Sequence, residues 1–170
     1  AAGNLAAAGA VALRHGAVAE VVEVKPLIVA IDGPAGAGKS TSARELARRL
    51  GVPYLDTGAM YRAIAVAVLD RDVDPQDRAA VETIAEAVRI ELSPDSAGRF
   101  EVLLDGAPVE GRIRTAEVGK ASSQVSAHSG VRARMVELQR AAAERFGGVL
   151  EGRDIGTRVF PDAPFKFFLD

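Results

Sequence analysis

The sequence lacks cysteine entirely, and neither sign of charge dominates it. Without cysteine there are no disulfide bonds, zinc–thiolate sites or cysteine nucleophiles. Lysine and arginine total 21 against 23 aspartates and glutamates, so the chain lacks the excess positive charge of nucleic-acid-binding proteins. No uncharged apolar run reaches about 18 residues, which excludes a membrane-spanning helix. We therefore expect a cytoplasmic monomer that binds small molecules, and neither nucleic acid nor membranes.

The composition that remains is that of a globular protein. Of 170 residues, 48% are hydrophobic and 26% are charged. This length fits one domain, or one domain with an insertion. Residues 1–26 stand apart, because their first half is small and apolar but no basic segment precedes it, unlike a signal peptide. We interpret 1–26 as a leader of unknown origin (a tag, a linker or the tail of a preceding domain).

At both ends of the remaining chain there are short apolar runs, and the segments between them include ones whose apolar residues recur at helical spacing. Continuous apolar runs are typical of strands buried on both faces of a parallel sheet. Their alternation with helices favours an α/β fold. The expected strands are 27–31, 52–55, 149–151 and 165–169, and the expected helices between them are 40–50 and 59–69.

The middle of the chain, residues 71–146, interrupts this pattern. Asp74 and Pro75 predict the start of a helix that runs to about residue 88. Thr115 and Ser129 are the expected N-caps of two later helices. Turn residues predict antiparallel strands at 89–92 and 99–104, with a short strand near 108–109. We expect an inserted α+β domain over 71–146 and a core domain formed by 27–70 and 147–170.

The segment Gly33–Ser40 matches the phosphate-binding pattern G-x-x-x-x-G-K-[ST]. Glycines let backbone N–H groups surround phosphate oxygens, and the following helix N-terminus adds positive potential. Lys39 would contact the β- and γ-phosphates of a nucleotide, and the Ser40 hydroxyl would bind Mg²⁺. The alternative is an ordinary glycine-rich turn, but the motif lies between a predicted buried strand and a helix, as phosphate binding requires.

Two further polar segments follow predicted core strands. Loops at the carboxyl ends of parallel strands border the ligand crevice. In the first segment, 56–62, Tyr61 offers an aromatic face, and the Arg62 guanidinium can bind a phosphate through two parallel hydrogen bonds. The alternative for Arg62 is an ordinary solvated surface arginine. In the second, 151–157, Glu151 could hold a water on Mg²⁺ or a substrate hydroxyl. The alternative is an ion-pair network of Glu151, Arg153 and Asp154 without a ligand.

These motifs, in this order and spacing, resemble the bacterial cytidylate kinase family. The resemblance runs from about residue 27 to 170 and includes segments 33–41, 56–62, 113–115, 121–125 and 151–164. It implies a P-loop NTPase-type fold with an inserted nucleoside-monophosphate-binding domain. It also implies a kinase that transfers the γ-phosphoryl group of ATP to CMP or dCMP with Mg²⁺.

The resemblance assigns roles to individual residues. Arg62 and Arg153 would hold the CMP phosphate, and with Lys39 they would act in catalysis. Ser123, Arg132 and Asp154 would read the cytosine, while Thr57 and Tyr61 would line the acceptor pocket. Glu151, where relatives also have aspartate, would hold the metal with Ser40. The expected ATP-binding residues are Gly33, Pro34, Ala35, Gly36, Ala37, Gly38, Lys39, Ser40 and Thr41.

Members of this family continue beyond the position of Asp170 with a lid that carries arginines, an adenine-binding loop, a further strand and a final helix. The alternative to an active kinase is therefore a fragment that binds phosphate or CMP but is impaired in catalysis. Other phosphate-loop proteins are less consistent with the sequence. A GTPase would need an N-K-x-D motif, which is absent, and a kinase of another metabolite would not need Ser123, Arg132 and Asp154 together.

Overall fold

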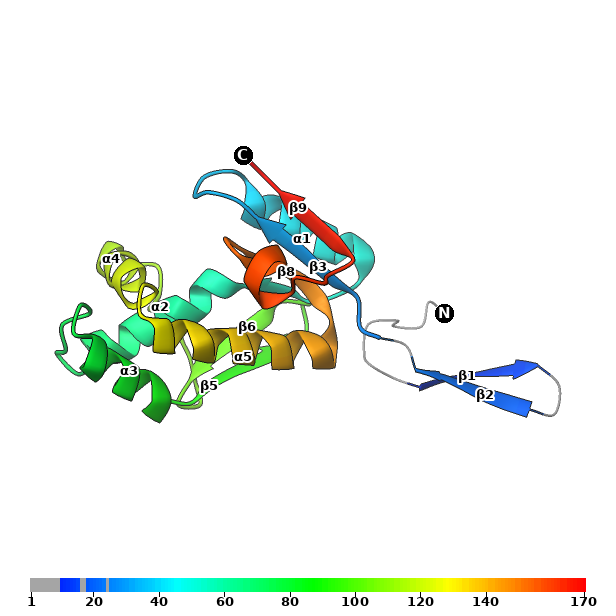
Figure 1. Ribbon diagram of the computed structural model, residues 1–170, viewed down its shortest axis with the longest axis horizontal. Helices are drawn as coiled ribbons and strands as arrows, with labels where there is room; N and C mark the ends of the chain where they lie inside the picture. Colours follow the sequence, from blue (N-terminus) through cyan, green and yellow to red (C-terminus); the bar gives the residue numbers. More distant parts are fainter. Residues whose placement is uncertain (1–9, 16–17, 24) are drawn as a thin grey trace.

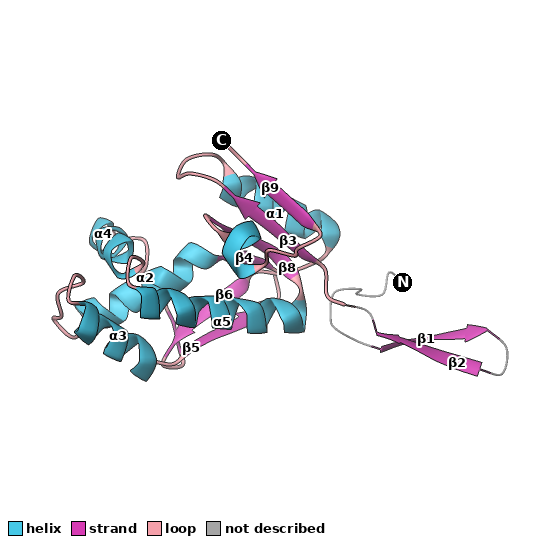
Figure 2. Cartoon of the chain, viewed as in Figure 1, coloured by secondary structure: helices cyan, strands magenta, loops and turns pink. Residues whose placement is uncertain are grey.

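A parallel sheet of four strands organises the chain. The computed structural model describes residues 10–15, 18–23 and 25–170. The strand order is β4-β8-β3-β9, and each neighbouring pair is parallel (Figure 1; β4 is labelled in Figure 2). This confirms the predicted α/β class and its four core strands. Their bounds are β3 (Ile28–Asp32), β4 (Tyr54–Asp56), β8 (Gly148–Gly152) and β9 (Phe165–Phe168).

The sheet is covered by helices on both faces because successive side chains of a strand point to opposite faces. In β3, Val29 and Ile31 pack with Ala43 and Ala47 of α1 (Lys39–Leu50). Ala30, between them, belongs to the larger core on the other face, which contains α2 (Thr57–Leu69). This explains why the strand reads as a continuous apolar run.

Helix α2 is the centre of the larger core. Its residues from Ala63 to Val68 are all buried, so it has no solvent-facing stripe over this stretch. It contacts α3 (Arg78–Ala87), α4 (Ala116–Val125) and α5 (Ser129–Phe146). Among the described helices, none is both long enough and apolar enough to cross a bilayer.

A second, antiparallel sheet lies within the middle segment. It contains β5 (Ile90–Pro94), β6 (Phe100–Leu104) and β7 (Ala107–Pro108), and α5 lies alongside β5 (Figure 2). One hydrogen bond joins it to the parallel sheet: the Tyr54 amide on β4 donates to the Gly98 carbonyl at 2.9 Å. The tip of the β5–β6 hairpin therefore contacts the edge of the main sheet.

The leader contains a hairpin that the sequence analysis did not predict. Strands β1 (Ala10–His15) and β2 (Val18–Glu23) pair antiparallel. The rest of the leader up to residue 24 lies outside the described residues, and the assignment of 1–26 as a tag, linker or tail stays a prediction.

The expected helix start was correct at Thr115, and the other starts are displaced by one to three residues. Thr115 caps α4, because its hydroxyl accepts the Val118 N–H at 3.2 Å. Helix α3 does not start at Pro75. The Asp74 carboxylate accepts the Gln76 N–H instead and forms a turn, and Asp77 caps the helix by accepting the Ala80 N–H.

Two further starts are displaced by one or two residues. Ser129 is the first residue of α5 rather than its cap, and His128 occupies the cap position without a side-chain hydrogen bond to the helix. Helix α2 starts at Thr57 instead of residue 59 because the Asp56 carboxylate caps it from the end of β4.

Candidate functional site

A cavity of about 540 Å³ opens at the carboxyl ends of β3, β4 and β8. The loops that follow these three strands line it, and α4 and α5 contribute further side chains. Because the strands are parallel and adjacent, segments more than 90 residues apart in sequence meet at one rim. The predicted convergence of the loops is therefore present.

The glycine-rich loop forms the end of the cavity next to α1. Gly36 has φ +85° and Gly38 has φ +79°, a left-handed conformation that strains residues with a Cβ atom. Gly38 also occupies the N-cap position of α1, so the first free N–H groups of the helix follow it directly. The Lys39 ammonium lies over the loop and donates to the Pro34 carbonyl at 2.6 Å.

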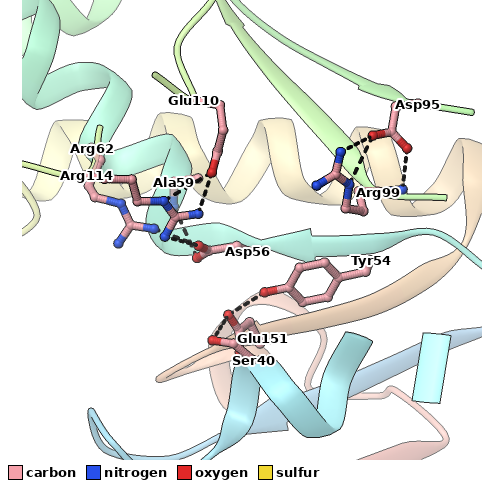
Figure 3. A network of polar contacts seen from close by, with 10 residues as sticks. All are labelled: Ser40, Tyr54, Asp56, Ala59, Arg62, Asp95, Arg99, Glu110, Arg114 and Glu151. Carbon is pink, nitrogen blue, oxygen red and sulfur yellow. Dashed lines mark hydrogen bonds and ion pairs between the residues drawn. The ribbon is translucent and has the colours of Figure 1, made fainter. Parts of the chain in front are cut away.

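Glu151, near the end of β8, is a buried carboxylate at the centre of the site. Only 4% of the residue is exposed. Its Oε1 accepts hydrogen bonds from the Ser40 hydroxyl at 2.7 Å and from the Tyr54 hydroxyl at 2.6 Å (Figure 3). Its Oε2 is buried and has no hydrogen-bond partner among the described residues. Burial, followed by the bond to Glu151, raises the pKa of Tyr54, so this phenol remains a donor at neutral pH.

A second polar group surrounds Asp56. Its Oδ2 accepts from Arg62 Nη2 at 2.6 Å, and its Oδ1 caps α2 through the Ala59 N–H (Figure 3). Arg114 Nη1 lies 3.8 Å from the same Oδ2, while its Nη2 bonds Glu110 at 2.8 Å. Two guanidinium groups therefore share one carboxylate at the cavity wall, which gathers several N–H donors there.

The cavity is also lined by an ion pair between Arg132 of α5 and Asp154, which follows β8. The two side chains are 34% and 27% exposed, respectively. Ser123 on α4 and Tyr61 on α2 line the same cavity. Burial raises the pKa of Tyr61 above its usual value. This wall presents a carboxylate, a guanidinium and an aromatic ring together.

A buried carboxylate positions the loop that carries Arg153 and Asp154. Asp32, at the end of β3, accepts the N–H groups of Ile155 and Gly156, each at 2.8 Å. These residues begin a short π-helical turn, η1 (Ile155–Val159). Because Asp32 is only 7% exposed, solvent competes little for these bonds. The turn is thus fixed directly after the two residues that face the cavity.

Most of the predicted site residues meet in this cavity, but part of the glycine-rich loop does not line it. The lining includes Ala35, Gly36, Lys39, Ser40, Thr57, Tyr61, Arg62, Ser123, Arg132, Glu151, Arg153 and Asp154. The predicted residues outside the lining are Gly33, Pro34, Ala37, Gly38 and Thr41. Thr41 already belongs to the first turn of α1.

Several residues of the cavity wall had no individual role predicted from the sequence. Arg114 directly precedes the correctly predicted N-cap Thr115, a position that could have indicated a loop arginine facing the strand ends. Ser122 and Ser126 are spaced i, i+4 beside Ser123, so helical spacing could have placed them on one face. The lining residues without an individual predicted role are Asp56, Gly58, Arg114, Ser122, Ser126 and Gly152, although the predicted segments 56–62, 113–115, 121–125 and 151–157 contain all of them except Ser126.

Comparison with known proteins agrees with this arrangement. The family model described as cytidylate kinase matches residues 29–170. The chain is 51% identical to a cytidylate kinase of Pelotomaculum thermopropionicum over 141 residues. These aligned residues make up 83% of this chain and 62% of the relative. It is 51% identical over 146 residues to a cytidylate kinase of Solibacter usitatus, covering 86% of this chain and 61% of the relative.

Another relative joins two activities in its name. The chain is 53% identical over 142 residues to a bifunctional pantoate ligase/cytidylate kinase of Prochlorococcus marinus, covering 84% of this chain and 29% of that protein. The chain thus spans less than two thirds of each of these three relatives. The family model covers nearly the whole parallel sheet and every loop that lines the cavity. The chain therefore belongs to the cytidylate kinase family.

Proposed function

We propose that the protein is a nucleoside monophosphate kinase that transfers the γ-phosphoryl group of ATP to CMP or dCMP. The observation that carries this proposal is that part of a phosphate loop, several arginines and the Arg132–Asp154 pair line one cavity. A phosphoryl donor and a phosphorylated acceptor both need cationic groups, and a reaction between them needs both ends in one space.

The donor end is the glycine-rich loop. Backbone N–H groups at the start of α1 and the ammonium of Lys39 would hold the phosphates of ATP. Among the described residues, the Lys39 ammonium bonds only its own loop, 2.6 Å from the Pro34 carbonyl. Exchanging that carbonyl for a phosphate oxygen replaces a neutral acceptor with a charged one, which strengthens the hydrogen bond.

Ser40 and Glu151 suit a magnesium ion. The Ser40 hydroxyl donates a hydrogen bond to Glu151, so the lone pairs of the Ser40 oxygen remain free for a cation. The buried, unpartnered Oε2 of Glu151 supplies a second oxygen of the hard type that Mg²⁺ prefers. When held by these two residues, Mg²⁺ would supply positive charge that offsets the charge of the ATP phosphates during transfer.

Arg62 and Arg153 would bind the acceptor phosphate, and Arg114 is placed to assist them. All three line the cavity. Arg62 is already oriented by Asp56 at 2.6 Å, and Arg114 lies 3.8 Å from the same carboxylate. An oriented guanidinium loses less freedom when it binds a phosphate, and it can bind in a bidentate manner.

The cytosine would lie at the Arg132–Asp154 wall. Cytosine has an exocyclic amino group beside a ring nitrogen and a carbonyl. Asp154 can accept from the amino group, and Arg132 can donate to the ring nitrogen or the carbonyl, with Ser123 assisting. Uracil has a carbonyl in place of the amino group, so it would leave Asp154 facing an acceptor. Thr57 and Tyr61 would line the rest of the pocket.

The chemical step then needs positioning rather than a covalent nucleophile. An oxygen of the CMP phosphate attacks the γ-phosphorus of ATP, and the bond from that phosphorus to the β–γ bridging oxygen breaks. The electron pair leaves with ADP, and the acceptor becomes CDP. Lys39 and the arginines stabilise the charge that spreads over the transferring oxygens.

A coupled assay of ADP release by the whole protein tests this function with CMP, dCMP, UMP and AMP as acceptors. We expect CMP and dCMP to be phosphorylated at least about tenfold faster than UMP, the discrimination available from one mismatched buried hydrogen bond. Folded protein that releases no ADP with CMP, or that prefers UMP or AMP, would contradict the proposal.

The second candidate function is binding of phosphate or CMP with impaired catalysis. The observation that favours testing it is that the chain spans less than two thirds of the length of the cytidylate kinases it matches. The 170-residue chain is assayed beside the whole protein, and its CMP affinity is measured by calorimetry. CMP binding without turnover by the chain alone would support this alternative for the chain. Equal turnover by both would exclude it.

We also propose that 27–70 with 147–170 form the core domain and that 71–146 form the monophosphate-binding insertion. Limited proteolysis with and without CMP tests these boundaries. The cytoplasmic location and monomeric state stay predictions, which fractionation and sedimentation can test.

A further inference from the structure

The proposed metal ligand Glu151 is held by two hydroxyl groups, and only one of them belongs to the phosphate loop. Ser40, in the first turn of α1, donates to Oε1 at 2.7 Å. Tyr54, on β4, donates to the same oxygen at 2.6 Å (Figure 3). A carboxylate oxygen has two lone pairs in its plane, so these two donors satisfy Oε1 completely. Oε2 is left as the oxygen available to a cation.

Tyr54 is itself fixed from several sides. It is 6% exposed and packs in the core between the sheet and α1, with Ala43 and Ala47. Its backbone amide donates to the Gly98 carbonyl at 2.9 Å. The guanidinium carbon of Arg44 lies 5.5 Å from the centre of its ring. A hydroxyl carried by so constrained a ring has little freedom to move away from Glu151.

This arrangement differs from a buried tyrosine that only fills space. The hydroxyl is directed out of the apolar core and into the polar site, and its hydrogen bond spans 97 residues of sequence. Glu151 has three side-chain torsions, and fixing a glutamate costs more conformational entropy than fixing a shorter acid. A second donor that orients the carboxylate in advance reduces the cost of binding a cation.

We propose that Tyr54 is a positioning residue that holds Oε1 of Glu151 so that Oε2 faces the metal of a bound metal–nucleotide complex. The proposal rests on the proposed function, because it takes Glu151 as the residue that meets the metal. Tyr54 touches neither the nucleotide nor the metal in this role. It acts only through the carboxylate.

The test measures metal affinity rather than turnover. Mn²⁺, a paramagnetic substitute for Mg²⁺, is titrated into the whole protein with a non-hydrolysable ATP analogue, and free Mn²⁺ is followed by electron paramagnetic resonance. The variants are Tyr54→Phe, Glu151→Gln and the double variant. The affinity for the analogue without metal is measured in parallel in the presence of a chelator.

We expect Tyr54→Phe to weaken Mn²⁺ binding about tenfold, within the range for outer-shell partners of metal ligands. Affinity for the metal-free analogue should stay within about twofold, because the hydroxyl does not touch the nucleotide. In the Glu151→Gln background the same change should have no further effect. Thr83→Val removes an exposed hydroxyl from α3, outside the cavity, and should leave Mn²⁺ affinity unchanged.

Four results would overturn the inference. Unchanged Mn²⁺ affinity in Tyr54→Phe, with Glu151→Gln weakened, would remove the role of Tyr54 but leave that of Glu151. Unchanged affinity in both variants would instead contradict the proposed metal site. An additive loss in the double variant, or an equal loss of metal-free nucleotide, would show that Tyr54 acts through the general structure.

Discussion

The carboxylate of Asp56 bonds Arg62 with one oxygen, 2.6 Å from Nη2, and caps helix α2 with the other. One side chain thus starts the central helix and orients an arginine proposed to bind the acceptor phosphate. Both partners are only about one-fifth exposed, so solvent weakens their attraction little. Mutation can separate the two roles of Asp56, which are to cap α2 and to orient Arg62.

Asp56→Asn keeps an acceptor for the cap but removes the charge that orients Arg62. We expect the KM for CMP to rise about tenfold, equivalent to the loss of one charge-assisted hydrogen bond, with nearly unchanged stability. Asp56→Ala should raise the KM similarly and also lower the free energy of unfolding by about 1 kcal/mol through loss of the cap. Steady-state kinetics and urea unfolding measure the two effects. An unchanged KM in both variants would show that Arg62 does not need Asp56.

Asp32→Asn should damage both the fold and the acceptor site. The substituted amide can accept only one of the two N–H bonds from Ile155 and Gly156, and its NH₂ group would face the other. We expect a loss of about 2 kcal/mol in the free energy of unfolding and weaker CMP binding. Urea unfolding and calorimetry are the measurements. Asp162→Asn, at an exposed site, is the matched control and should stay within about 0.5 kcal/mol of the parent. A stable variant with normal CMP affinity would contradict this role.

Lys39→Ala should abolish turnover while the fold remains. Its ammonium bonds only the Pro34 carbonyl among the described residues, so little stability depends on it. The loss of this cation removes several kcal/mol of transition-state stabilisation, and kcat should fall below about a tenth of the parent value. Lys166→Ala is a close control, since Lys166 bonds the Pro161 carbonyl across the same five-residue spacing but lies outside the cavity. Retained turnover in Lys39→Ala would refute the assignment of the phosphate loop.

Asp154→Ala should lower kcat/KM for CMP far more than for UMP. A mismatched buried hydrogen bond costs about 1–3 kcal/mol, so the CMP/UMP ratio should fall about 5- to 150-fold. Because Asp154 forms an ion pair with Arg132, Arg132→Ala should change the ratio in the same direction, and the double variant should be less than additive. Kinetics with both nucleotides in a lid-containing protein provide the measurement. Equal losses for CMP and UMP would mean that Asp154 orients the phosphate or Arg153 instead.

Glu82 makes acid stability depend on the contact between α3 and α5. Its carboxylate accepts the Gly130 N–H at 2.8 Å, and this bond, with Arg78, lowers the pKa of Glu82. A carboxyl with a lower pKa in the folded state stabilises the protein above its unfolded pKa and loses that contribution as the pH falls through the folded pKa. We expect the unfolding midpoint of the parent to fall more steeply than that of Glu82→Gln between about pH 5 and pH 3. Urea titrations at several pH values measure this, and parallel curves would contradict it.

The sequence alone determined the elements that depend on local signals. The glycine-rich loop lies between a buried strand and a helix, as its motif predicted, because left-handed glycines and the helix N-terminus are local features. Thr115 caps its helix for the same reason. Local signals failed where two of them competed. Asp74 used its carboxylate for a turn, and Asp77, three residues later, became the cap.

Only the tertiary structure decided which polar side chains meet. Ser40 and Tyr54 both bond Glu151, across 111 and 97 residues, and Asp32 bonds a turn more than 120 residues away. The pairing of β3, β4 and β8 brings these residues together, and strand order is set by the burial of apolar faces rather than by the polar residues themselves. The contact between Arg114 and the Asp56 carboxylate, 3.8 Å from nitrogen to oxygen, could therefore not be predicted, because no local signal in the sequence pairs these two residues.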